Sequence, residues 1–257
     1  MIIDAHSHVH DPVDAHLALL DEAGVDKAVL FATRAHPERA QDLAGLNAEF
    51  AVLADALRGG KTDAFAAAFA ELHATLDAHP DRFIGFGSVP LDAPDIAGYV
   101  EREIAGRGLH GIGELTAPPD HAEAVEPVLR AAADHGLPVV VHGFAPTTAG
   151  DIRTFAALAR RHPSVPLVLS QLGGLQWTDA VALARETPNL YLELSTPVTV
   201  FAVRLAIAEL PERTLFGSDA PYGDPVLARL TVERATRSPE VRARVLGGTF
   251  STLLRKP

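Results

Sequence analysis

Short apolar runs recur along the chain, and each is followed by a segment with the spacing of a helix. Most of them begin about 25 residues after the previous one, the length of a strand, a loop and a helix together. Several consist of Val, Ile, Leu and Phe without alternation, as expected for strands buried on both faces. The eight runs are Ile2–Val9, Lys27–Thr33, Phe83–Val89, His110–Leu115, Pro138–Phe144, Pro166–Leu172, Leu190–Ser195 and Thr214–Ala220.

The segments between these runs are predicted to be helices. The stretch His121–His135 is expected to form one helix, because its apolar residues fall on a single stripe. Those residues are Val125, Val128, Leu129 and Ala132. Thr196 and Pro197 are predicted to open the helix after the seventh run, because proline is tolerated in the first turn of a helix.

Eight alternating strand and helix units predict an α/β fold, a closed parallel (β/α)8 TIM barrel. A doubly wound open sheet is the alternative, but such sheets usually have about five or six strands. The chain has 257 residues, close to the ~250 of a single barrel, and no linker divides it. We therefore expect one domain spanning residues 1–257.

One interval between runs, from Arg34 to Arg82, is about twice the usual length. It contains two helical patterns, Pro37–Leu57 and Thr62–Ala78, separated by Arg58-Gly59-Gly60-Lys61. This helical insertion, at about residues 34–82, either enlarges the outer helix layer or covers the barrel mouth. The second interpretation follows from position, because a connection from strand to helix emerges on the face that carries the active site.

Composition narrows the class of protein. Hydrophobic residues make up 47% of the chain, and the net charge of −11 argues against a nucleic acid or an anionic membrane as partner. No apolar run approaches the ~20 residues of a membrane helix, and no signal peptide is visible. We expect a cytoplasmic protein that acts on a small molecule, and a homo-oligomer is left open. Cysteine is absent, so any metal must be held by His, Asp or Glu.

Ionisable residues follow the apolar part of four runs. His6 and His8 are separated by one residue, so in a strand both side chains point to the same face. Glu114, His142 and Asp219 end the fourth, fifth and eighth runs. In a barrel these positions converge on one mouth, which predicts a metal centre.

The predicted ligand types suit a divalent metal. Histidine with carboxylate favours zinc, with manganese as an alternative. Asp219 is the candidate catalytic residue, because a carboxylate beside a metal can accept the proton of an activated water.

These motifs resemble those of the amidohydrolase superfamily, and the resemblance covers nearly the whole chain. The stretch from Ala78 to Pro90 resembles the third-strand region of the amidohydrolase-related branch. The motifs are His6-Ser7-His8, His142, Asp219, Leu172-Gly173-Gly174 and Leu246-Gly247-Gly248. The resemblance implies a barrel with a metal at its C-terminal mouth. It also implies hydrolysis of a C–N or C–O bond in most members and nonoxidative decarboxylation in some.

Two positions bear on the number of metal ions. Glu114 stands where TatD-like hydrolases have a glutamate that bridges two metals, whereas Gln171 stands where members with a full ligand set have a histidine. An amide is a poor zinc ligand, so one ion is favoured over two. Gln171 is expected to face the mouth, either as a neutral contact to substrate or as the mark of a site that has lost catalysis.

Three further residues are candidates for the site. Arg34 ends the second run and is a candidate clamp for a substrate carboxylate, or a surface cation that pairs with a loop acid. Tyr222 follows the eighth run and is expected to line the substrate pocket. Asp4 is expected to share the face of His6 and His8, one step deeper, and to orient a histidine.

The sequence leaves three hypotheses for the function of this protein. The leading hypothesis is a metal-dependent hydrolase of a small amide, lactone or ester. A metal-dependent decarboxylase of a small carboxylic acid is the alternative. A non-catalytic barrel is the third, and Gln171 is the residue in its favour.

Overall fold

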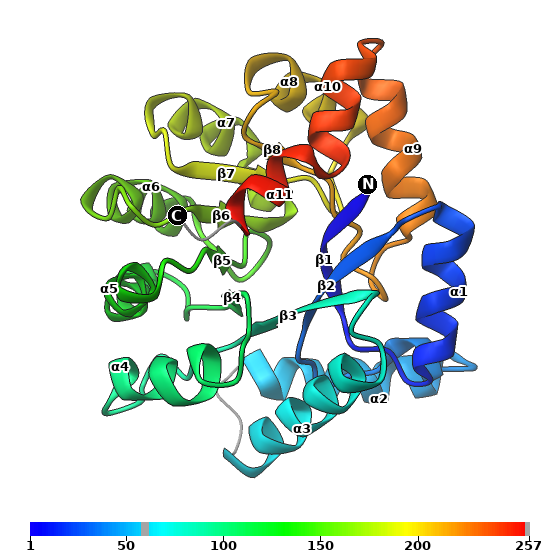
Figure 1. Ribbon diagram of the computed structural model, residues 1–257, viewed down its shortest axis with the longest axis vertical. Coiled ribbons are helices and arrows are strands. Elements are labelled where there is room, and N and C mark those ends of the chain that lie inside the picture. The colour runs from blue at the N-terminus through cyan, green and yellow to red at the C-terminus, as the bar shows by residue number, and fades with distance from the viewer. Residues whose placement is uncertain (58–61, 255–257) are drawn as a thin grey trace.

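Eight parallel strands form a single sheet in the order in which they occur along the chain. The computed structural model describes residues 1–57 and 62–254. The last segment lies against the first, because Asp219 N donates to His6 O at 2.7 Å and Ala220 bridges Ser7. The barrel in Figure 1 confirms the predicted fold class over the open sheet. The strands are β1 (Ile3–His8), β2 (Lys27–Phe31), β3 (Phe83–Gly87), β4 (Gly111–Leu115), β5 (Val139–Val141), β6 (Leu167–Leu169), β7 (Leu190–Glu193) and β8 (Thr214–Leu215).

Helices surround the barrel and connect its strands (Figure 1). Within the part of the chain that the structure describes, no helix combines the length and the apolar character needed to span a membrane. The α-helices are α1 (Val13–Ala23), α2 (Leu43–Leu57), α3 (Thr62–Ala78), α4 (Ile96–Tyr99), α5 (Glu126–His135), α6 (Ala149–Arg161), α7 (Trp177–Glu186), α8 (Val200–Glu209), α9 (Pro225–Ala235), α10 (Pro239–Ala243) and α11 (Thr249–Leu253). The 3-10 and π-helical segments are η1 (Pro37–Arg39), η2 (Val100–Ala105), η3 (Ala122–Val125), η4 (Ser170–Gln176) and η5 (Arg244–Gly248).

Two helices begin later than the sequence predicts. The stretch predicted as a helix from His121 opens with the 3-10 turn η3, and the α-helix begins at Glu126 with a proline in its first turn. The helix after β7 begins at Val200 rather than at Thr196. The reason is a better cap, because the Thr199 hydroxyl accepts a hydrogen bond from Ala202 N.

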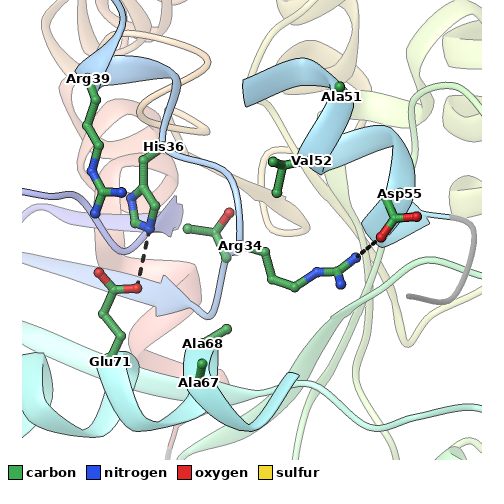
Figure 2. A pocket seen from close by; sticks show the side chains of 10 residues that line it. Arg34, His36, Arg39, Ala51, Val52, Asp55, Ala67, Ala68 and Glu71 are labelled. Carbon is green, nitrogen blue, oxygen red and sulfur yellow. Dashed lines mark ion pairs between the residues drawn. The ribbon is translucent and has the colours of Figure 1, made fainter. Parts of the chain in front are cut away.

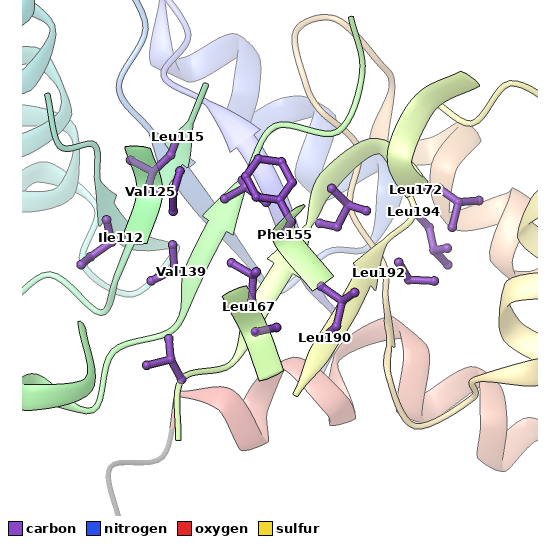
Figure 3. Packing of buried hydrophobic residues seen from close by; sticks show 14 of the residues in the cluster. Ile112, Leu115, Val125, Val139, Phe155, Leu167, Leu172, Leu190, Leu192 and Leu194 are labelled. Atoms are coloured by element: carbon purple, nitrogen blue, oxygen red, sulfur yellow. The ribbon is translucent and has the colours of Figure 1, made fainter. Parts of the chain in front are cut away.

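The core has two layers. Figure 3 shows the outer layer, in which side chains from the strands pack against the helices. The inner layer fills the barrel and joins residues of several strands to Phe250 and Leu253 of α11. Strand β5 shows the alternation, with Val140 in the inner cluster and Val139 in the outer one. This packing leaves the carboxyl ends of the strands for polar side chains.

The connection between β2 and β3 contains η1, α2 and α3. Helix α3 packs against the core through Phe69 and Leu72, which are 7% and 0% exposed, so it belongs to the outer layer. The Gly59-Gly60 break lies outside the described residues. Side chains of α2 line a cavity next to the end of β2. That α2 covers the mouth remains a prediction, as does the assignment of one domain.

Candidate metal centre

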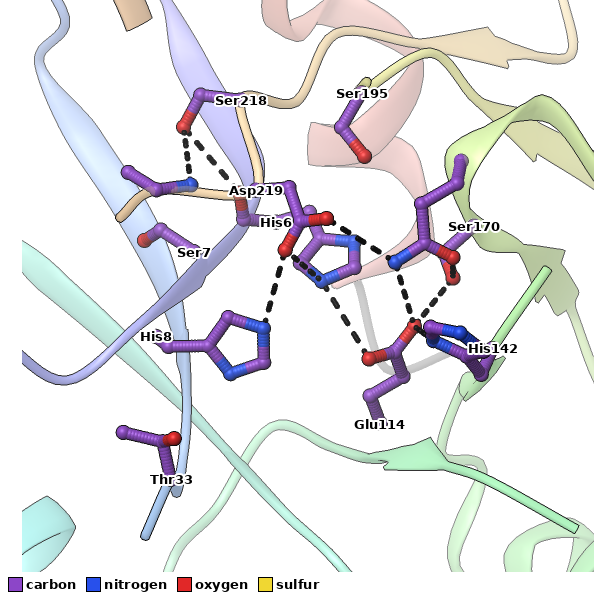
Figure 4. Close-up of polar contacts among 12 residues, drawn as sticks. His6, Ser7, His8, Thr33, Glu114, His142, Ser170, Ser195, Ser218 and Asp219 are labelled. Atoms are coloured by element: carbon purple, nitrogen blue, oxygen red, sulfur yellow. Dashed lines mark hydrogen bonds and ion pairs between the residues drawn. The ribbon is translucent and has the colours of Figure 1, made fainter. Parts of the chain in front are cut away.

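The two histidines of β1 point to a carboxylate that follows β8. Figure 4 shows the rings of His6 and His8 beside the carboxylate of Asp219. Their Nε2 atoms lie 3.4 and 3.2 Å from Asp219 Oδ1. His6 is fully buried, and the side chain of His8 is 12% exposed. Asp219 has a left-handed backbone, φ 59°, and its N–H donates a hydrogen bond to His6 O of β1. Residues at opposite ends of the sequence therefore meet at one point.

Glu114 completes this group from β4. Its Oε2 atom lies 3.7 Å from His6 Nε2. One ligand atom each from His6, His8 and Glu114 lies within 4.8 Å of the other two. The donor set is histidine nitrogen and carboxylate oxygen, which divalent transition metals accept.

The charges around His6 indicate whether the site suits a cation. His6 Nε2 is buried and has no hydrogen-bond partner. Burial disfavours a charge on this ring, but Asp219, Glu114 and Glu193 outweigh it and raise the pKa of His6 to about 10. A pKa raised this far shows an excess of buried negative charge that a proton or a metal cation can balance. The residues present therefore fit a divalent metal.

The same interactions keep the two carboxylates ionised. Burial opposes the charge on Glu114, yet His142 and His6 hold its pKa well below the usual value. Burial likewise opposes the charge on Asp219, and His6 and His8 lower its pKa. Both side chains can therefore act as anionic ligands at neutral pH.

His142 lies beside Glu114 rather than beside the β1 histidines. Its Nδ1 atom is 3.0 Å from Glu114 Oε1, and its Nε2 atom is 3.1 Å from the Ala145 carbonyl oxygen. Glu114 thus stands between His142 and His6. The predicted role of His142 as a direct ligand stays a prediction.

Gln171 is brought into the same group. It follows β6 and is only 3% exposed. Its side chain contacts Glu114 and Asp219 rather than open space at the mouth. Protein groups thus contact both ends of the carboxamide, and the predicted contact of Gln171 with substrate stays a prediction.

Glu193 is a functional candidate that the sequence analysis missed. It ends β7, is fully buried, and its Oε2 atom lies 3.0 Å from His6 Nδ1. Glu193 also accepts hydrogen bonds from Gln171 N and from the backbone and hydroxyl of Ser195. The sequence does contain a pattern that indicates Glu193, because Leu190–Glu193 is an apolar run that ends in an acid, and Glu114 lies near the end of the β4 run in the same way. Glu193 fixes the ring of His6 so that Nε2 faces the carboxylates.

Glu193→Gln is therefore expected to weaken metal binding by about 10- to 100-fold, the usual cost of losing an orienting partner of a ligand. The change keeps the side-chain shape but removes the charge that holds His6 Nδ1–H. Competition with a chelator measures the affinity. Glu186→Gln, at the end of α7, is the matched control, and an equal loss in both variants would contradict the role of Glu193.

Asp4 does not orient an imidazole, contrary to the role the sequence suggests. Its carboxylate accepts hydrogen bonds from His6 N and from the backbone and hydroxyl of Ser218. The pairing of β1 with β2 shifts between Asp4 and Ser7, so simple alternation fails there. Burial raises the pKa of Asp4 to about 7. Asp4 joins the backbones of β1 and the segment after β8.

Tyr222 contacts a histidine of the centre, whereas Arg34 lines a cavity beside α2 and α3. The Tyr222 ring meets the His8 ring edge-on, with centroids 5.6 Å apart. Arg34 lines a cavity of about 660 Å³ between the end of β2 and helices α2 and α3 (Figure 2). Its guanidinium is 3.9 Å from Asp55 of α2. Both sequence interpretations of Arg34 thus remain, a clamp facing a cavity and a cation beside an acid.

The chain was compared with models of known protein families. The model described as amidohydrolase matches residues 3–255. The chain belongs to the amidohydrolase family. This match confirms the resemblance that the ordered motifs of the sequence predict. A search of curated proteins gives no match.

Solved structures share the barrel of this protein at low sequence identity. An uncharacterised TIM-barrel protein from Bordetella bronchiseptica has a TM-score of 0.73 and 15% identity, covering 98% of each chain. The 5-carboxyvanillate decarboxylase from Sphingomonas paucimobilis has a TM-score of 0.70 and 19% identity, covering 100% of this chain and 99% of its own. A dihydroxybenzoic acid decarboxylase from Polaromonas sp. JS666, solved with manganese and the inhibitor 2-nitroresorcinol, has a TM-score of 0.67 and 17% identity, covering 98% of this chain and 96% of its own. Such likeness shows the fold alone.

Proposed function

We propose that this protein is a metal-dependent hydrolase that cleaves a C–N or C–O bond in a small amide, lactone or ester. The observation that carries the proposal is the position of Asp219. Its ionised carboxylate lies against the Nε2 atoms of both β1 histidines, where a cation and its water would meet.

The cation would be held by His6, His8, Asp219 and Glu114, with His142 as a further candidate. Zinc is the ion we favour from the ligand types, and manganese is the alternative. When bound, the ion lowers the pKa of a water and polarises the scissile carbonyl group.

Asp219 performs the proton transfers. Its carboxylate accepts a proton from the attacking water, and the same proton then passes to the leaving nitrogen or oxygen. Glu193 holds His6 by its Nδ1 atom, so that the ring keeps its orientation while the charge on Asp219 changes. The amide of Gln171 and the imidazole of His142 are hydrogen-bonded within the site.

Substrate binding is assigned to the side chains around the mouth. Arg34 would pair with an anionic group, because a guanidinium binds a carboxylate through two hydrogen bonds. The ring of Tyr222 contacts His8 and would form part of the wall beside the reacting group. A small polar molecule with one anionic end suits these positions.

Decarboxylation of a small carboxylic acid is the second candidate. It is favoured by the similar structures, since two of those described above are decarboxylases of aromatic acids. The same metal and acid–base groups could serve this reaction. Asp219, which is ionised at neutral pH, would first take up a proton from solvent and then deliver it to the carbon as the bond to carbon dioxide breaks.

Product analysis distinguishes the two reactions. The metal-loaded protein would be offered a panel of lactones, aryl esters and anilides, and separately a panel of hydroxybenzoic acids. We expect release of carboxylate from the first panel, at least ~10²-fold slower in Asp219→Asn, and no carbon dioxide from the second. Carbon dioxide release without hydrolysis would replace the first proposal with the second.

A further inference from the structure

The carboxamide of Gln171 has a fixed orientation. Its Oε1 atom accepts hydrogen bonds from Gly143 N at 2.9 Å and Phe144 N at 3.3 Å. Two backbone donors identify this atom as the oxygen, because an amide NH₂ group cannot accept them. The amino group must therefore point the opposite way, toward the metal centre.

That amino group lies between two carboxylates. Gln171 Nε2 is 3.2 Å from Glu114 Oε1 and 3.3 Å from Asp219 Oδ2. An NH₂ group has two hydrogens, so it can donate one to each carboxylate. The Ser170 hydroxyl, 2.5 Å from Glu114 Oε1, can add a further donor on this side.

Each carboxylate thus has one oxygen on either side of the centre. Glu114 Oε2 and Asp219 Oδ1 face His6 Nε2, at 3.7 and 3.4 Å. The two other oxygens face Gln171, and His142 Nδ1 lies 3.0 Å from the glutamate oxygen on that same side. The first side has the imidazole nitrogens of His6 and His8 for a cation, whereas on the second side the hydrogens of a neutral amide lie beside the single imidazole of His142.

We propose that the Gln171 carboxamide takes the place of a second cation between Glu114 and Asp219 and so limits the centre to one ion. The inference rests on the metal centre of the proposed function. The amide hydrogens screen the repulsion between two buried anions, while the amide nitrogen offers no lone pair to a metal. Gln171 is thus a positioning residue, because it holds the two carboxylates with their free oxygens toward His6.

Replacing Gln171 with a residue that can ligate a metal should allow a second ion to bind between Glu114 and Asp219. Gln171→His would supply a nitrogen lone pair beside two carboxylate oxygens and His142. Gln171→Glu keeps the shape of the side chain and adds a third anion. The protein would be freed of metal, loaded with excess Mn²⁺ and passed through a desalting column, and the tightly bound manganese would then be measured. Electron paramagnetic resonance distinguishes an isolated Mn²⁺ ion from an exchange-coupled pair.

We expect one isolated ion in the wild type and two coupled ions in both variants. Gln176→His, five residues along the same segment, is the matched control and should keep one ion. Two ions in the wild type would overturn the inference, as would a single ion in both variants. A wild type without manganese would instead refute the metal centre itself, so the two failures differ.

Gln171→Leu tests the positioning role without offering a new ligand. Loss of both amide donors is expected to weaken the binding of the single Mn²⁺ by about 10- to 100-fold, as for other partners of metal ligands. The affinity is measured by chelator competition, and thermal unfolding of the metal-free protein shows whether the variant folds. A folded variant with unchanged affinity would contradict the role.

Discussion

Asp219→Asn is expected to lower the turnover of an established substrate by at least ~10²-fold, the lower end of the contribution of a general base. Asparagine keeps the shape of the side chain, and its oxygen can still face His6 and His8. It cannot accept the proton of the attacking water. Because the pKa of Asp219 is held below its usual value by His6 and His8, the wild-type residue is ionised and ready to accept that proton at neutral pH.

Turnover is compared at saturating substrate and saturating metal, so that weaker metal binding in the variant does not imitate a loss of catalysis. Asp179→Asn, on the exposed surface of α7, provides the matched control. We expect the control to keep full turnover. If the Asp219 variant turned over at the wild-type rate, another group would have to be the base.

Much of the fold follows from the sequence because parallel strands buried on both faces have a strong signal. The eight apolar runs coincide with the eight strands, although the strands are shorter. β5 ends at Val141 and β6 at Leu169, so His142 and Gln171 lie in the connections that follow. An ionisable residue directly after an apolar run is the pattern that predicts Glu114 and Asp219 at the mouth. In the structure both carboxylates lie near His6.

The contacts within the site could not be predicted in the same way. Asp4 departs from the expected alternation because β1 shifts its register against β2. The contacts of Gln171 depend on a left-handed backbone at φ 49°, which nothing in the local sequence requires of a glutamine. Glu193 ends an apolar run, as the sequence shows. Its contact with His6 joins β7 to β1, which are far apart in the sequence, so the structure was needed to find it.

The paired substitution His6→Ala/His8→Ala is expected to abolish tight metal binding altogether. The wild type, purified without chelator and offered zinc or manganese, should hold close to one equivalent. The variant removes two of the three residues whose ligand atoms lie within 4.8 Å of one another, and leaves carboxylates that bind transition metals weakly by themselves. Elemental analysis after desalting measures the bound metal.

The control for this result removes the same number of imidazoles elsewhere. His121→Ala/His135→Ala changes two histidines at the start of η3 and the end of α5, which contact Pro119 and Glu101 rather than a residue of the metal centre. That variant should keep its metal. The removal of His6 also leaves Glu193 without its imidazole partner in a fully buried position, so the variant should be less stable as well as metal-free. Metal retained at wild-type stoichiometry by a folded His6→Ala/His8→Ala protein would show that the ion is bound elsewhere, and the assignment of the centre would then be wrong.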